Sequence, residues 1–427
     1  MDTVRLAATK ILYNVATKGA WANVELAQAL RQGKFTDLDR KFCTELVYGA
    51  VKAGASLDWK IAKYVSRPLS KVDAKLMAVL RVGMYQIFFL DRVPNSAAVN
   101  ESVELAKKFC GLGESKFVNA VMRAANREPH KSDFPADDSV QSLALRTFHP
   151  ARIVELFIEE FGSDATKLLA FDNTDPPLCL RVNRLRTTRE NILTALKNLG
   201  VQAQPSAFAP EGIICRGHGS LDNFQALRHG LCQVQDESSM TAAHLLDPKP
   251  GEFVIDSCAA PGGKSTHIAE LMGNRGRIVA ADIHESKLKH IAQNARRLGI
   301  TIIEPLAADA RSLGKNFPAQ ADRVLVDAPC SGLGVLRRKA DVRWKNLDDL
   351  DALPTLQTEI LSGASEALKS GGTLVYSTCT ILRRENEAVI EKFLASHENF
   401  RLVQMKTLLP HVTGTDGFFA AKLIRTN

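Results

Sequence analysis

The sequence lacks several patterns that would assign a function directly. Its eight cysteines are scattered and none form a Cys-x-x-Cys pair, which argues against a zinc ribbon and a disulfide scaffold. No apolar run approaches the length of a membrane span, the nearest being residues 85–90, and no signal peptide is recognisable. We therefore expect a cytoplasmic protein with no metal centre and no membrane partner.

Two nucleotide-binding motifs are also absent. Gly263-Lys264-Ser265 matches the end of a phosphate-binding P-loop, but that motif requires a glycine where this chain has Cys258. The Gly-x-Gly-x-x-Gly pattern of nicotinamide enzymes does not occur. These absences exclude the usual triphosphate and dinucleotide signatures and leave S-adenosylmethionine as a cofactor that fits.

The most informative stretch that is present is a turn between an apolar strand and a helix. Residues 252–255 predict a short buried strand, and residues 266–271 predict the helix that follows. Between them, Gly262 and Gly263 allow the backbone to approach a ligand and to point amide groups at it. A tight turn in any α/β domain gives the same pattern, so the turn alone names no ligand.

Basic charge is concentrated in the first third of the chain. Residues 1–131 contain 21 Lys or Arg and 12 Asp or Glu, whereas the remainder contains 34 and 35. Such an excess indicates an anionic partner, although a solvated helical surface gives the same counts. Apolar residues recur there at helical spacing, so we expect an all-α domain over residues 1–131.

Two further domains are expected after a polar, proline-containing linker at residues 128–138. Residues 141–229 predict a small α/β domain, and residues 230–427 alternate strands and helices as in a doubly wound, Rossmann-like α/β sheet. A row of arginines in the middle domain forms either a basic ridge for RNA phosphates or a solvated face. We favour RNA contact for these residues, Arg181, Arg184, Arg186 and Arg189.

Reactive and acidic residues follow the predicted strands of the last domain, where ligands bind in such sheets. Asp282 ends a strand about 20 residues after Gly262, the usual place for an acid that binds ribose hydroxyls, with a capping aspartate as the alternative. Asp309 is placed to contact an adenine edge. Cys330 and Cys379 each follow a strand end, so we expect both thiols in one crevice rather than as separate buried structural cysteines.

Two thiols beside a methyl donor indicate a particular reaction. A thiolate can add to C6 of a pyrimidine, which makes C5 nucleophilic enough to accept a methyl group. The reaction needs an ionised sulfur, an acid near the ring nitrogen and a second group that helps to undo the adduct.

Three motifs resemble the Sun (Fmu) family of S-adenosylmethionine-dependent RNA cytosine-C5 methyltransferases. They are Cys258-Ala259-Ala260-Pro261-Gly262-Gly263-Lys264, Asp327-Ala328-Pro329-Cys330-Ser331-Gly332 and Ser377-Thr378-Cys379. Residues 92–101 and 115–121 resemble the NusB family, a helical RNA-binding domain. The resemblance implies an rRNA (cytosine-C5)-methyltransferase that acts on 16S rRNA, free or in an early small-subunit particle, and we expect it to be a monomer.

The resemblance also implies roles for individual residues. Cys379 is the nucleophile, Cys330 assists product release, Asp327 holds the cytosine near N3 or N4, and Lys264 supports the same site. Pattern alone does not choose between the cysteines, because DNA cytosine-C5 methyltransferases use the Pro-Cys cysteine, here Cys330. The implied cofactor contacts are Cys258, Ala259, Ala260, Pro261, Gly262, Gly263, Lys264, Asp282, Asp309 and Asp327.

Two other classes of protein remain as rivals, a non-catalytic RNA-binding protein and a DNA methyltransferase. The four residues Lys264, Asp327, Cys330 and Cys379 argue against the first, and the NusB-like segment argues against the second. A basic run after Cys330 either grips the displaced RNA strand or forms a flexible loop; its residues are Arg337, Arg338, Lys339, Arg343 and Lys345.

Overall fold

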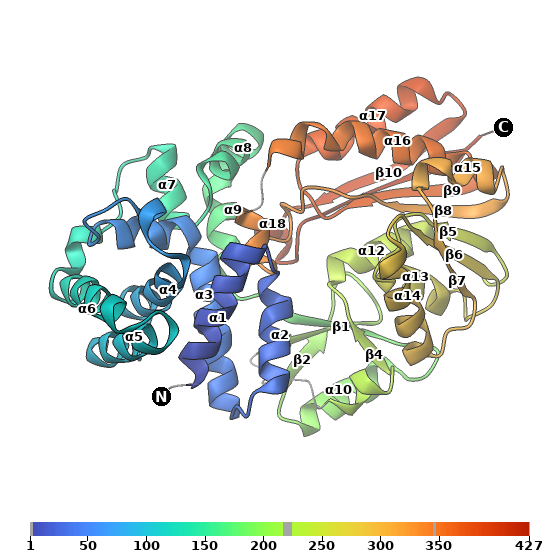
Figure 1. Cartoon of the computed structure of the whole chain (residues 1–427). Coiled ribbons are helices and arrows are strands. Elements are labelled where there is room, and N and C mark those ends of the chain that lie inside the picture. Colours follow the sequence, from blue (N-terminus) through green and yellow to red (C-terminus); the bar gives the residue numbers. More distant parts are fainter. Residues whose placement is uncertain (1–2, 217–223, 345–346, 427) are drawn as a thin grey trace. The chain divides into compact units, whose positions relative to one another are not determined.

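The computed structural model describes residues 3–216, 224–344 and 347–426. The chain forms two compact units, one of Met1–Asn173 with Lys339–Lys345 and one of Thr174–Arg338 with Asn346–Asn427 (Figure 1). We call them the helical unit and the catalytic unit. Residues 141–173, expected in the middle domain, thus lie in the helical unit. Across the described ranges, every helix is too short or too polar to cross a membrane.

The helical unit begins with six main helices, which confirms the all-α class expected from the apolar spacing. They are α1 (Thr3–Lys18), α2 (Ala22–Gln32), α3 (Asp37–Ala62), α4 (Ala74–Phe89), α5 (Asn95–Phe109) and α6 (Leu112–Arg127). The most apolar of these helices, α4, buries Leu76, Val79, Leu80 and Met84 and is the centre of the bundle core. Three shorter helices follow: α7 (Val140–Thr147), α8 (Ala151–Phe161) and α9 (Ala165–Phe171).

The short segment 339–345 belongs to the helical unit although it lies far along the sequence. The Trp344 indole donates to the carbonyl of Val51 at 2.8 Å, and its ring lies beside Gly54. A side chain at Gly54 would collide with that ring, and α3 is kinked there with a φ of 39°. Glycine is therefore required at this point of α3.

Most of the basic run expected to grip RNA is engaged within the protein. Arg343 is fully buried, and Arg338 pairs with Asp236 and Asp416 at 2.7 and 2.6 Å. Arg337 is also buried, and Lys345 lies outside the described residues. The interpretation of Arg337, Arg338 and Arg343 as an exposed RNA grip is wrong, because their guanidinium groups are held by internal partners or buried.

The catalytic unit starts with a small antiparallel sheet, which confirms the expected α/β middle domain. Its strand order is β2-β3-β1-β4, and α10 (Arg189–Asn198) packs against it. The core of this layer contains Leu180, Ile192, Leu196 and Ile213. The strands are β1 (Leu178–Val182), β2 (Gln202–Pro205), β3 (Gly212–Arg216) and β4 (Cys232–Val234).

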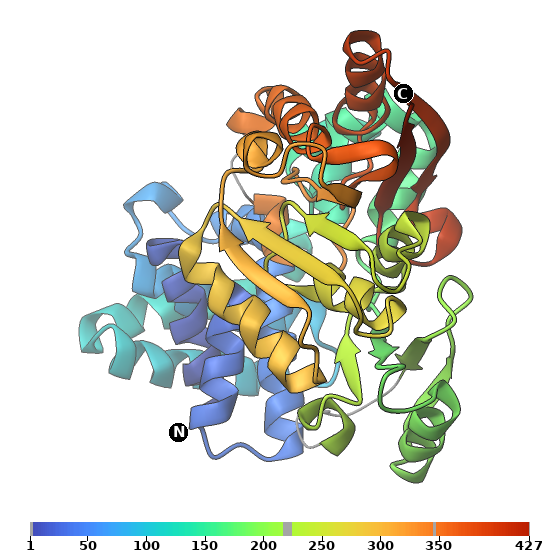
Figure 2. The same ribbon diagram turned by 90° about the vertical axis from the view of Figure 1, so that its right-hand side faces the viewer.

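A seven-stranded sheet of order β10-β11-β9-β8-β5-β6-β7 forms the rest of the catalytic unit. Strands β5 to β9 are parallel, and β10 and β11 are added antiparallel at one edge, which confirms the Rossmann-like fold. Figure 2 shows the parallel strands side by side in yellow and orange. The strands are β5 (Phe253–Asp256), β6 (Arg277–Asp282), β7 (Ile303–Ala307), β8 (Ala321–Asp327), β9 (Leu368–Thr378), β10 (Phe400–Leu408) and β11 (Phe418–Arg425).

Helices cover both faces of this sheet. One apolar core includes residues of α12, α13 and α14, and the other includes residues of α16 and α17. Because β8 lies between β5 and β9, the loops that follow these three strands meet at one edge. The helices are α12 (Glu237–Leu246), α13 (Gly263–Leu271), α14 (Glu285–Leu298), α16 (Leu353–Ser365) and α17 (Glu387–Ser396).

Candidate active site

A cavity lies over the turn between β5 and α13. Six of the seven residues of the predicted cofactor loop line it, together with four residues from neighbouring segments. The lining residues are Gln235, Ser239, Asp256, Cys258, Ala259, Ala260, Pro261, Gly263, Lys264 and Asp327. The loop that the sequence singled out therefore forms most of the cavity wall.

Gly262, the remaining loop residue, does not line the cavity but shapes the turn. Its φ is 98°, and a Cβ atom there would lie 3.1 Å from the Cα atom of Ile291 in α14. The position therefore needs glycine both for its left-handed backbone and for close packing against α14. Burial raises the pKa of the Cys258 thiol to about 12, which favours its protonated form at neutral pH.

Lys264 and Asp327 form an ion pair where the cavity approaches the cysteines. Lys264 Nζ lies 2.7 Å from Asp327 Oδ2, and the Ser377 hydroxyl donates to Asp327 Oδ1 at 2.8 Å. Burial would lower the pKa of Lys264, but the Asp327 carboxylate, and after it the charge on Cys379, raises that pKa above its ordinary value. Lys264 is therefore a fixed positive charge beside both the acid and the Cys379 sulfur.

The two cysteines face one another across the loops after β8 and β9. The Sγ atoms of Cys330 and Cys379 are 3.4 Å apart, and both residues are half-buried. The hydrogen bond with Cys379, then burial and the charges of Cys379 and Glu385, raise the pKa of Cys330 well above its ordinary value. The raised pKa favours the protonated form of Cys330, whose S–H can then donate to the Cys379 sulfur.

Glu385 fixes the backbone that carries Cys330. Its carboxylate accepts from the Ser331 amide at 2.8 Å and from the Ser331 hydroxyl at 2.6 Å. Gln357 Nε2 donates to the same carboxylate at 3.1 Å and to the carbonyl of Pro329 at 2.9 Å. The buried Glu385 therefore holds Ser331 directly and Pro329 through Gln357, and these two neighbours of Cys330 in the chain set the position of its sulfur.

The two aspartates expected to bind the nucleoside differ from each other. Asp282 is buried and accepts from the amide of Ala260 at 3.3 Å and from that of His284 at 2.9 Å. Asp309 is paired with Arg311 at 2.6 Å. Neither lines the cavity, but Asp282 binds the cofactor loop directly and Asp309 is held by its own neighbour.

Sequence reasoning gave no role to several residues that the structure brings to the site: Gln235, Ser239, Asp256, Ser377 and Glu385. Asp256 carried a usable signal, because it ends the strand that enters the turn. Gln235 and Glu385 lie in segments that also resemble the Sun (Fmu) family, but that resemblance gave them no role, because only folding brings their segments to the loops.

The cavity suits S-adenosylmethionine. Gln235 Nε2 is buried there and has no hydrogen-bond partner among the described residues, so it is available to an oxygen acceptor. Asp256 and Asp327 supply carboxyl oxygens that can accept hydrogen bonds from an amine. The cofactor carries both kinds of group, a carboxylate and hydroxyls together with an amine and a sulfonium, and so fits this donor set.

Comparisons with known proteins agree with this geometry along the whole chain. The 16S rRNA methyltransferase RsmB/F model matches residues 243–424, the NusB family model residues 2–127, and the RsmF/B-like ferredoxin-like domain model residues 149–222. The chain is 37% identical to the probable ribosomal RNA small subunit methyltransferase B of Bacillus subtilis, over 99% of this chain and 98% of that protein. It is 38% identical to the protein of the same name in Synechocystis, over 99% of each. Among solved structures, that of PH0851 has a TM-score of 0.88 at 27% identity and 99% coverage of both chains.

Proposed function

Because the chain belongs to the ribosomal RNA small subunit methyltransferase B family and uses S-adenosylmethionine, we propose that it methylates C5 of a cytosine in 16S rRNA. The observation that carries this proposal is the Cys330–Cys379 pair, with sulfurs 3.4 Å apart beside the Lys264–Asp327 ion pair. This is the donor set that a thiol-dependent methylation of a pyrimidine requires. The substrate is the rRNA, free or in an early small-subunit particle.

Cys379 is the proposed nucleophile. The nearby Lys264 charge favours its thiolate, which adds to C6 of the cytosine. Asp327, oriented by Lys264 and Ser377, hydrogen-bonds the N3–N4 edge of the ring. S-adenosylmethionine supplies the methyl group that C5 then accepts.

Cys330 assists the release of product. After C5 is methylated, water accepts its proton, the electron pair of the C5–H bond forms the C5=C6 bond, and the C6–S bond breaks with its electron pair on the Cys379 sulfur. The protonated Cys330 stabilises the departing Cys379 sulfur by donating its S–H across the 3.4 Å gap. Exchanged roles are the alternative: Cys330 would then be the nucleophile, although the hydrogen bond with Cys379 and burial raise its pKa.

RNA binding is assigned to the basic N-terminal segment, which matches the NusB family. Phosphate contacts there would give affinity without base readout. The target base must leave its stack to reach Cys379, at a cost of a few kcal/mol.

The proposal is tested by transfer of a labelled methyl group to 16S rRNA, with DNA of the same sequence as a control. Cys379→Ser should abolish transfer, and Cys330→Ala should accumulate a covalent protein–RNA complex that survives denaturation. Cys110→Ala, a half-buried cysteine of the helical unit, should behave as the unmodified protein. Exchanged results for Cys379 and Cys330 would reverse their roles, and full activity in both variants, or transfer to DNA alone, would overturn the proposal.

A further inference from the structure

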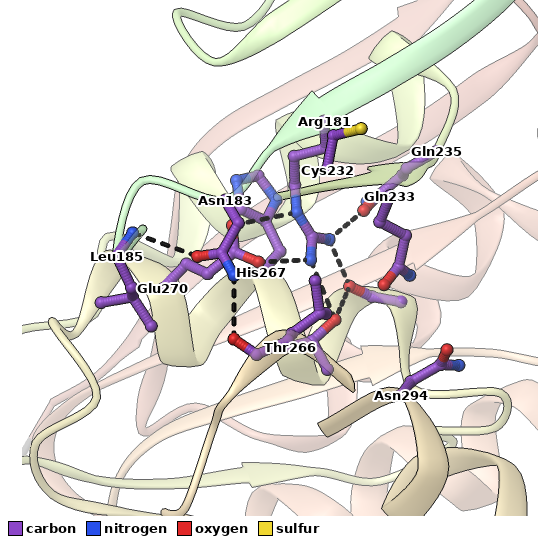
Figure 3. Close-up of polar contacts among 12 residues, drawn as sticks. Arg181, Asn183, Leu185, Cys232, Gln233, Gln235, Thr266, His267, Glu270 and Asn294 are labelled. Carbon is purple, nitrogen blue, oxygen red and sulfur yellow. Dashed lines mark hydrogen bonds and ion pairs between the residues drawn. The ribbon is translucent and has the colours of Figure 1, made fainter. Parts of the chain in front are cut away.

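Arg181 lies in β1 of the middle sheet, yet its guanidinium reaches the start of the helix that follows the cofactor loop (Figure 3). The side chain is fully buried. It donates to the carbonyl of Gly263 at 2.7 Å, to the Thr266 hydroxyl at 3.0 Å and to the Gln235 side-chain oxygen. Its remaining hydrogen bonds, at 2.9 and 3.2 Å, go to the two carboxylate oxygens of Glu270. The expectation that Arg181 contacts RNA is therefore wrong.

Two of these partners, Gly263 and Gln235, line the cofactor cavity. Gly263 begins α13, and Thr266 in turn donates to the carbonyl of Gly262 at 2.8 Å. The guanidinium therefore binds the backbone of the loop's last turn both directly and through Thr266. A shift of this arginine would shift the wall of the cavity.

Arg181 also decides which way the amide of Gln235 points. Because Gln235 Oε1 accepts from Arg181, the Nε2 group is directed elsewhere, and it is the buried, unpartnered donor noted above among the described residues. An arginine has no acceptor, so the opposite orientation of the amide is excluded. The cavity thereby gains a fixed donor for an oxygen of its ligand.

We propose that Arg181 is a positioning residue for S-adenosylmethionine, through which the middle sheet sets the shape and the donor of the cofactor cavity. The inference adds a residue to the reaction proposed above and rests on that function only for its activity readout. The cofactor affinity of the protein without RNA tests it independently.

A purely structural ion pair with Glu270 is the competing explanation, and Arg181→Lys separates the two. Lysine keeps a positive charge next to Glu270, but its single ammonium cannot span the Gly263 carbonyl, Gln235 and the carboxylate together. A structural ion pair would survive this change in large part, whereas positioning of the loop would not.

The chain offers a matched control on the same strand. Asn183, labelled in Figure 3, is also fully buried, and its amide nitrogen donates to the carbonyls of Gly230 and Leu298, each at 2.9 Å, which lie outside the cofactor loop. Asn183→Ala therefore removes a buried polar link of the middle sheet and leaves the Arg181 contacts in place.

The experiment measures the dissociation constant of S-adenosylmethionine by calorimetry on the full chain, with melting temperature and amide hydrogen exchange of residues 258–266. Arg181→Lys should weaken binding by about tenfold or more, the loss expected for one charge-assisted hydrogen bond, and should speed exchange in the loop. Asn183→Ala should lower the melting temperature and change the dissociation constant less than about twofold.

Gln235→Leu retains Arg181 and should also weaken binding by about tenfold, which keeps the test decisive if Arg181→Lys does not fold. Unchanged affinity in either of the Arg181 and Gln235 variants, or an equal loss in Asn183→Ala, would overturn the inference. A protein that binds the cofactor as expected and yet transfers no methyl group to RNA would instead count against the proposed function.

Discussion

Among the described residues, each unit contains one fully buried arginine, and the hydrogen-bond acceptors of the two arginines differ in charge. Arg181 in the catalytic unit meets a carboxylate, that of Glu270, in addition to neutral acceptors. Arg343 in the helical unit donates to the carbonyls of Phe148 and Asp172 and to the side-chain oxygen of Asn173, at 3.0, 2.6 and 2.8 Å. Burial lowers the pKa of Arg343 to about 10, although the charge of Asp172 opposes the shift.

This difference in partners indicates a different structural role for each arginine. The charge of Arg181 is neutralised by the neighbouring Glu270 carboxylate. Arg181 can therefore be buried next to the cofactor loop, because its side-chain partners are grouped around that one site. Arg343 instead donates mainly to backbone carbonyls. Because these carbonyls belong to loops that are separate in the sequence, the hydrogen bonds connect those loops. Arg343 thus links segment 339–345 to the loops before α8 and after α9, and its loss should affect folding rather than ligand binding.

The largest predicted effect follows from this contrast. Arg343→Met keeps much of the apolar stem but removes three hydrogen bonds to buried or half-buried acceptors, so we expect the helical unit to lose about 3–5 kcal/mol of stability. All three tryptophans, Trp21, Trp59 and Trp344, belong to this unit, so urea unfolding followed by tryptophan fluorescence reports on it alone. The affinity for S-adenosylmethionine should not change.

Arg81→Met is the control for this measurement. Arg81 pairs with Asp58 at 2.7 Å, but both side chains are about a quarter exposed, so removal should cost only about 1 kcal/mol. An equal loss of stability in the two variants would show that Arg343 stabilises the unit no more than a partly exposed ion pair does. The structural role inferred for Arg343 would then be wrong.

These arginines also mark the limit of what the sequence could predict. Local periodicity predicted the strands, the turn at Gly262 and Gly263, and the approach of Cys330 to Cys379, because strand ends of a parallel sheet meet at one edge. Arg181 and Arg343 looked like exposed basic residues, because their acceptors come from segments remote in the sequence. A local sequence pattern cannot predict hydrogen-bond acceptors that come from remote segments.

The same contrast between neutral and charged partners distinguishes the two aspartates of the nucleoside prediction. Asp282 is held by the backbone amides of Ala260 in the cofactor loop and of His284, whereas Asp309 is held by the Arg311 guanidinium. Asp282→Asn removes one acceptor that orients the loop, so the dissociation constant of S-adenosylmethionine should rise about tenfold. Asp309→Asn, the matched variant, should change it less than about twofold.

Calorimetric titration of both variants with S-adenosylmethionine measures the two dissociation constants. If Asp309→Asn weakens binding as much as Asp282→Asn, then Asp309 contacts the cofactor despite its pairing with Arg311. Direct contact with the loop would then be a poor guide to which acids bind the ligand.

The smallest predicted effect concerns Asp256, a buried acid whose hydrogen-bond donor is the neutral Ser265 hydroxyl at 2.6 Å. Burial raises its pKa to about 7, although the hydrogen bond from Ser265 opposes the shift. The folded protein therefore keeps a proton that the unfolded chain releases above about pH 4. Stability consequently falls as the pH rises from about 4 to about 7.

Asp256→Asn removes this contribution, so its stability relative to the unmodified protein should improve by about 1 kcal/mol between pH 6 and pH 8. Asp322→Asn is the control: burial raises the pKa of Asp322, but Lys369 and the Phe253 amide lower it overall, so its stability difference should be flat in this range. Urea midpoints from circular dichroism give both differences. A flat difference for Asp256→Asn would mean that the carboxyl is already ionised below pH 6 and that the neutral Ser265 donor suffices to hold a buried charge, as neutral acceptors do for Arg343.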